Sequence, residues 1–279
     1  MRGYAASNIA WPFEMRLAAY QVLIDLGITG LEIAPGMLFA DVPDAFAPPD
    51  WLLKERVQEV SRAGLSLVSM QSLLFGVRDV QLFGAPEQRT NYATALKRAV
   101  RLASSLSIPH LVLGSPKERV IPVGMAPDEV LRIASDTLGD VADYAVAQGC
   151  RIGLEPNPEV YGTNFATNTN SAGEIVRQIN HPGVILTLDV GSLLVNGELP
   201  NIVPITTAYA DLIGHVHVSE PQLAPAPNDP ATAARVIAAL SATGYGGWVS
   251  LEMRASGDTS IEVLRMALGR LGTAIHQAF

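Results

Sequence analysis

The sequence predicts one (β/α)8 barrel, a TIM barrel, that occupies residues 1–279 as a single domain. Two observations lead to this. An amphipathic run, a Gly, a short apolar segment and a polar loop recur in that order along the chain. The pattern is clearest in AAYQVLIDLGITGLEI, ERVQEVSRAGLSLVSM, DVADYAVAQGCRIGLEPN and VIAALSATGYGGWVSLEM. No break in composition marks a linker, and α/β barrels commonly have this length.

Each part of the repeat has a physical reason. Gly suits the left-handed residue that ends a helix. The apolar segments that follow are too short for helices and suit buried parallel strands. Their alternation with amphipathic runs indicates βαβ units. The rival, an open doubly wound sheet, would carry a Gly-rich phosphate loop after its first strand, and the segment SNIAWPFEM has none.

We expect eight strands, near 3–8, 29–33, 65–70, 109–113, 151–155, 184–189, 213–218 and 247–252. We expect eight helices, near 13–27, 50–63, 88–106, 127–148, 170–180, 200–211, 229–243 and 259–275. The longer loops all follow strands, at 34–49, 71–87, 114–126, 156–169 and 219–228. In a barrel they would gather at the C-terminal face, where active sites lie.

Composition excludes several classes of protein. A chain that is 48% hydrophobic and 16% charged is not disordered as a whole. Its net charge of −8 and its lack of basic runs argue against a nucleic-acid partner. No apolar run predicts a signal peptide or a membrane span. The single cysteine, Cys150, excludes an intrachain disulfide and is compatible with the cytoplasm, where we expect the protein. A homo-oligomer is left open.

Residues of the kind that bind metals end four successive predicted strands. These residues are Glu155, Asp189, His215 with His217, and Glu252. Each acid interrupts an apolar strand, where an unpaired charge is costly, and a shared cation would remove that cost. An oxygen-rich set with one imidazole suits one divalent ion, Mn²⁺, Mg²⁺ or Co²⁺, with Zn²⁺ as a further option. The alternative is that each acid is simply the first solvated residue of a loop.

Side-chain alternation predicts that the three acids face the barrel axis. The residues two positions before them, Gly153, Thr187 and Ser250, would then lie beneath them on the same face. Because these residues are small or polar, they would leave room for a site.

The motifs GLEI, LEPN, LDVG, HVHVSE and GWVSLEM occur in this order along nearly the whole chain. In this the sequence resembles the xylose isomerase-like TIM barrel superfamily, the sugar phosphate isomerase/epimerase family. That superfamily includes sugar isomerases, ketose 3-epimerases, inosose dehydratases and abasic-site endonucleases. The resemblance implies that Glu155, Asp189, His217 and Glu252 are the metal ligands. It also implies that Glu155 and Glu252 are the catalytic acid–base pair.

Two positions depart from the family pattern. Ser192 stands where many members carry a His, and Leu223 stands where the epimerases tend to carry an Arg. Both departures weaken the assignment as a ketose 3-epimerase but leave the single-metal site intact. An endonuclease would need further His ligands and a basic face, and the chain has only five His.

Five further residues are candidates for substrate contact. Glu32 faces inward in GLEI and suits either a hydrogen bond to a substrate hydroxyl or a structural ion pair. His215 suits either the support of a metal ligand or the filling of the barrel. Lys117 and Arg119 suit a carboxylate, a phosphate or a developing oxyanion, unless they are exposed loop charges. Arg254 follows the last strand and points to the same cavity by its spacing.

The function that the sequence favours is a metal-dependent sugar isomerase or epimerase. It would transfer a proton next to a carbonyl through a metal-stabilised enediolate of a small polyhydroxylated substrate. The runner-up is a metal-dependent lyase or dehydratase that acts on a keto-sugar or inosose by β-elimination. A barrel that binds a sugar without turnover is the third hypothesis.

Overall fold

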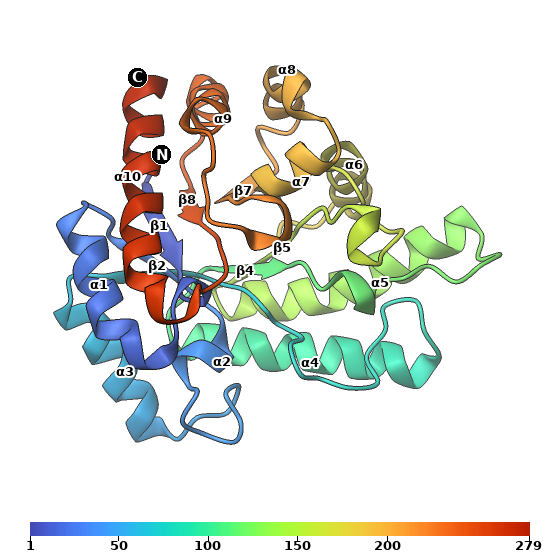
Figure 1. The fold of residues 1–279 in the computed structure, drawn as a ribbon. Coiled ribbons are helices and arrows are strands. Elements are labelled where there is room, and N and C mark those ends of the chain that lie inside the picture. Colours follow the sequence, from blue (N-terminus) through green and yellow to red (C-terminus); the bar gives the residue numbers. More distant parts are fainter.

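A closed barrel of eight parallel strands forms the centre of the protein (Figure 1). The computed structural model describes residues 1–279. The strands follow one another around the barrel in chain order, and the last pairs with the first. They are β1 Gly3–Ser7, β2 Gly30–Ile33, β3 Ser66–Met70, β4 His110–Leu113, β5 Arg151–Leu154, β6 Val184–Asp189, β7 Ile213–Val218 and β8 Trp248–Leu251. The predicted (β/α)8 barrel is confirmed.

Helices surround the barrel and bury the outward faces of its strands (Figure 1). The eight predicted helices are α1 Arg16–Asp25, α3 Asp50–Arg62, α4 Pro86–Ser105, α5 Pro127–Ala147, α6 Thr169–Ile179, α8 Ile202–Ala208, α9 Pro230–Ala242 and α10 Ser260–Ala278. The last helix packs between α9 and α1, so the ends of the chain complete the ring. No helix combines the length and the apolar character needed to cross a bilayer.

Two short helices were not predicted, α2 Pro35–Leu38 and α7 Val190–Val195. The first lies inside the segment 34–49, which the sequence pattern describes only as a loop. The second begins directly after β6. Neither is long enough to show a helical period, which needs a window of about 11 residues or more. α7 matters for the site, because its first turn adjoins one of the candidate metal ligands.

The interior of the barrel is polar, where barrels of this type are usually filled by branched aliphatic side chains. The inward-facing polar residues are all at most 6% exposed, and they are Ser7, Glu32, Ser69, His110, Thr187, His215, His217 and Ser250. Buried polar groups need hydrogen-bond partners. The interior therefore has to be organised as a network.

Gly153 makes room for this network. A Cβ atom at this position would lie 2.7 Å from ring atoms of His110 and would collide with the Thr187 hydroxyl. His110 Nε2 lies 3.2 Å from that hydroxyl. Glycine is therefore required on this strand by close packing inside the barrel.

Replacing Gly153 with alanine should destabilise the protein by about 1–3 kcal/mol, because overpacking displaces neighbours that cannot move away. Urea unfolding followed by circular dichroism measures the change. Gly139→Ala in α5 is the matched control, because its added Cβ meets no atom within 4 Å. It should stabilise the helix by up to about 1 kcal/mol. Equal stability of the two variants would contradict the packing argument.

Candidate metal centre

Four side chains converge at the C-terminal end of the barrel. Glu155, Asp189, His217 and Glu252 each offer one ligand atom, and these atoms all lie within 4.8 Å of one another. They come from the ends of β5, β6, β7 and β8, which are neighbours in the barrel. The structure thus brings together the four residues that the family resemblance singled out.

The arrangement leaves two buried atoms without hydrogen-bond partners. His217 Nδ1 lies 2.8 Å from Glu155 Oε1 and 3.2 Å from Glu252 Oε2. Despite the short distance, His217 Nδ1 and Glu155 Oε1 are not aligned for a hydrogen bond. Buried polar atoms without partners are costly, and a cation between them would remove the cost. The three carboxylates and one imidazole fit a divalent ion that prefers oxygen and nitrogen ligands.

Asp189 is fixed by the start of α7. Its side chain caps the helix, and Oδ1 accepts a 2.6 Å hydrogen bond from the Ser192 backbone N–H. The other carboxylate oxygen accepts a hydrogen bond from the Ser219 hydroxyl, which in turn accepts one from the Gly191 N–H. Burial and the nearby charge of Glu155 raise the pKa of Asp189 above its ordinary value.

Arg119 holds the segment that carries Glu155. Its guanidinium is fully buried, and Nη2 donates 2.7 Å hydrogen bonds to the Glu155 backbone carbonyl and to Asn157 Oδ1. Burial lowers the pKa of Arg119 to about 10, so it is still charged at neutral pH. Gly114 gives the carboxylate its space, because a Cβ there would lie 2.7 Å from Glu155 Oε2.

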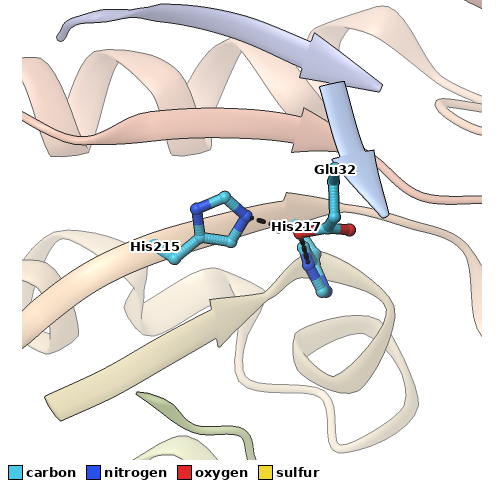
Figure 2. A group of neighbouring side chains, drawn as sticks. All are labelled: Glu32, His215 and His217. Carbon is cyan, nitrogen blue, oxygen red and sulfur yellow. Dashed lines mark hydrogen bonds and ion pairs between the residues drawn. The ribbon is translucent and has the colours of Figure 1, made fainter. Parts of the chain in front are cut away.

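Glu32 holds His217 from the other side (Figure 2). Its Oε2 lies 2.9 Å from His215 Nε2 and 3.0 Å from His217 Nε2. Ser69 Oγ donates to the same oxygen at 2.6 Å, and Gln71 Nε2 donates to Oε1 at 3.0 Å. Because an ionised carboxylate only accepts hydrogen bonds, Nε2 of His217 carries a proton. Nδ1 is thereby the atom that faces the three other carboxylates.

The charges in this cluster are strongly coupled. Burial alone would raise the pKa of Glu32, but the charge of His217 and the hydrogen bonds from both imidazoles hold it well below 4.5. Burial alone would lower the pKa of His217, but the carboxylates of Glu32, Glu252 and Glu155 raise it well above 6.5. Without a cation, His217 is therefore an imidazolium among carboxylates.

A stacked pair of neutral imidazoles lies deeper in the barrel. The rings of His110 and His215 are 4.7 Å apart between centroids. Burial is the main cause that lowers the pKa of each of them. Of the three histidines inside the barrel, only His217 has a raised pKa.

The three carboxylates of the cluster adjoin a cavity of about 680 Å³, while His217 is fully buried and does not line it. All three carboxylates, Glu155, Asp189 and Glu252, line it, and Lys117 and Arg254 lie at its rim. Such a volume lies within the range of small-molecule sites. Of the five residues predicted from the sequence to contact the substrate, only these two therefore line the space that a substrate would occupy.

Glu32, His215 and Arg119 do not line this cavity. Each is at most 1% exposed, and each is hydrogen-bonded to other parts of the protein. Both oxygens of Glu32 are engaged, so the structural alternative stated for it is the one that the geometry favours. Arg119 is not the exposed loop charge that the sequence allowed. All three lie behind the wall of the cavity and position the residues that form it.

Three residues at the site escaped the sequence analysis. Asn157 belongs to the motif LEPN and Ser219 to the motif HVHVSE, close after β5 and β7. Their place in these motifs was the signal from which a role at the site could have been predicted. Gln71 follows β3 and donates hydrogen bonds to both Glu32 and Ser7. Its position at a strand end was the only sign of this role.

Fold and cluster together define an eight-stranded parallel barrel with a candidate metal site at the C-terminal end of its strands. The chain belongs to the family described as "Xylose isomerase-like TIM barrel", which matches residues 20–271. No curated protein sequence matches it.

Three solved structures show the same fold over nearly the whole chain. The 3-keto-D-glucoside 4-epimerase of E. coli has a TM-score of 0.76 at 19% identity and covers 96% of this chain and 98% of its own. An L-ribulose 3-epimerase has a TM-score of 0.77 at 16% identity and covers 100% of this chain and 96% of its own. The D-psicose 3-epimerase of Clostridium cellulolyticum H10 has a TM-score of 0.75 at 16% identity and covers 99% of this chain and 98% of its own.

The affinity of the cluster for Mn²⁺ should rise with pH. Because the pKa of His217 is raised well above 6.5, binding at neutral pH displaces a proton from Nδ1. Below that raised pKa, the association constant should grow by about tenfold per pH unit, and above it the growth should stop. Isothermal titration calorimetry in buffers of different ionisation enthalpy counts the released protons. Binding without proton release at pH 7 would contradict the assignment of Nδ1 as a ligand atom.

Glu32→Gln should weaken Mn²⁺ binding by about 10- to 100-fold while the protein stays folded, because the amide no longer fixes His217 Nε2 as a donor. Glu198→Gln is the control, since Glu198 instead accepts a 3.1 Å hydrogen bond from the Thr169 N–H. Asp189→Ala removes a ligand outright and sets the lower limit of affinity. Calorimetry and circular dichroism give affinity and folding separately. Equal affinity of the Glu32 and Glu198 variants would remove the positioning role.

Proposed function

We propose that the protein is a divalent-metal-dependent isomerase or epimerase of a small polyhydroxylated sugar. One observation carries the proposal: three carboxylates converge with one buried imidazole and line a cavity at the C-terminal face. Active sites of this fold lie at that face. The neighbouring structures add support, because their names describe epimerases of keto-sugars.

Glu155 and Glu252 are the proposed acid–base pair. They follow β5 and β8, three strands apart around the barrel, and both expose part of their side chains to the cavity. One would remove a proton from the carbon next to the carbonyl, and the other would return a proton. Return to the opposite face gives an epimer, and return to the neighbouring carbon gives an isomer.

The remaining residues would bind and orient the substrate. A bound Mn²⁺, Mg²⁺ or Co²⁺, with Zn²⁺ as a further option, would supply Lewis-acid stabilisation of the charge that develops on the carbonyl oxygen. Lys117 and Arg254 at the rim suit the more distant hydroxyls. Ser192 has its hydroxyl engaged with the Pro156 carbonyl at 2.8 Å, so it keeps the wall of the cavity in place.

A lyase is the second candidate, favoured by the same two cations. Lys117 and Arg254 are exposed at the cavity rim, where a positive charge would stabilise a departing oxygen. Elimination uses the same first step, removal of a proton next to the carbonyl. It differs in that the electron pair then expels a β-substituent, so the product lacks that group.

Glu155→Gln and Glu252→Gln should each reduce turnover by about a hundredfold or more, because the amide cannot act as a base. The test incubates the Mn²⁺-loaded protein with ketoses, keto-sugars and inososes in heavy water and follows deuterium uptake and products by NMR. Glu262→Gln, on the exposed face of α10, is the control and should keep full activity. Deuterium in an intact sugar indicates epimerisation, and loss of a substituent indicates elimination. Full activity in both glutamine variants would show that the base lies elsewhere.

A further inference from the structure

We propose that the site accepts a glycoside, whose sugar faces the carboxylates and whose uncharged apolar aglycone lies in a second cavity beside the first. The inference rests on the proposed function and adds a substrate class to it. It starts from the continuity of two cavities. Ser72 and Phe75, in the loop after β3, line both of them.

The second cavity is of similar size, about 610 Å³, and a larger share of its lining residues is hydrophobic, 7 of 13 against 5 of 22 in the first. It is formed by the segments that follow β1, β2 and β3, and its apolar lining includes Ile9, Ala34, Met37, Ala45, Phe46 and Val77. Each of the two cavities is within the range that holds a drug-sized group. A free sugar on the carboxylates would leave the second cavity to water.

The charges in the second cavity exclude an ionic occupant. Its only charged lining residues are Asp44 and Arg98, and they form an ion pair with each other. The Arg98 guanidinium also lies over the ring of Phe46, 5.5 Å from its centroid. No free cation remains to bind a phosphate or carboxylate, so the complementary group is neutral and apolar.

Phe75 points to the same occupant. Its side chain is 82% exposed at the junction of the two cavities. Exposed apolar groups that adjoin an apolar hollow are typical of ligand sites. An aromatic ring there offers a face on which an aryl or alkyl group of the substrate packs. Two cavities that meet at one aromatic side chain thus match a molecule with a polar half and an apolar half.

The test compares two ligands that differ only in the aglycone, phenyl and methyl 3-keto-β-D-glucopyranoside, with the Mn²⁺-loaded protein. Calorimetry should show that the phenyl glycoside binds about tenfold more tightly or better, because its ring leaves water. Gly36→Leu should abolish this preference and leave the methyl glycoside unaffected. Gly36 lines the second cavity, and its added Cβ meets no atom within 4 Å, so a leucine is accepted there without a clash and would take up part of the space beside the aglycone.

Two further variants sharpen the comparison. Gly269→Leu in α10 is the matched control, because it is also an exposed helical glycine whose Cβ meets nothing within 4 Å, and it should keep the preference. Phe75→Ala should reduce the preference without changing Mn²⁺ affinity. Equal or undetectable binding of both glycosides, or a preference that survives in Gly36→Leu, overturns the proposal. Dissociation of an oligomer by Gly36→Leu with no aglycone preference also overturns it, since a second copy would then cover the cavity.

The two proposals fail separately. An aglycone preference without Mn²⁺-dependent turnover would support the second cavity and remove the proposed function. Mn²⁺-dependent turnover of free ketoses with no aglycone preference would support the function and remove the second cavity.

Discussion

The carboxylate of Glu32 is a full charge inside the barrel with no exposed surface, and the polar interior is arranged around it. Burying a charge is expensive unless donors surround it. Glu32 has four, from His215, His217, Ser69 and Gln71. Ser69 and Gln71 lie on β3 and at its end, and both imidazoles lie on β7. The network therefore forms only when the closed barrel brings these strands together with β2. The orientation of His217, a candidate metal ligand, therefore depends on the closed barrel.

The other candidate ligands are supported to different degrees. Asp189 is held by a backbone N–H of Ser192 and a neighbouring hydroxyl, and Glu155 is carried on a segment that Arg119 fixes. The Glu252 carboxylate accepts no side-chain hydrogen bond, and its nearest charged neighbour is His217 Nδ1, 3.2 Å away. It follows β8 directly, so its backbone is fixed while its carboxylate is the least restrained. The proposed acid–base pair is therefore asymmetric: the Glu155 carboxylate accepts one long hydrogen bond, 3.5 Å from Asn157 Nδ2, and the Glu252 carboxylate accepts none.

The strands and the residues of the candidate metal cluster could be picked out because their signals are local. Glycines before short apolar runs mark the strands, and Glu155 and Glu252 stand out as charges that interrupt them. The role of Glu32 could not be predicted from the residues around it, because its partner His217 is 185 positions away. Arg119 escaped for a similar reason, since a cation in a polar loop looks exposed until its buried partners are known. The second cavity is assembled from three separate loops and has no motif.

The long-range contacts of Glu32 also connect two parts of the C-terminal face, the second cavity and the carboxylates. The second cavity is built mainly by segments after β1, β2 and β3, whereas the carboxylates that line the first lie at the ends of β5, β6 and β8. Glu32 belongs to β2, but its hydrogen bonds reach His215 and His217 on β7, across the barrel interior. The closed strand ladder fixes the positions of the two cavities, and these hydrogen bonds add a direct link between β2, which leads into the second cavity, and the candidate ligand His217. A substrate that spans both cavities would therefore have its two ends placed by the barrel itself, with the buried charge of Glu32 as one further connection between them.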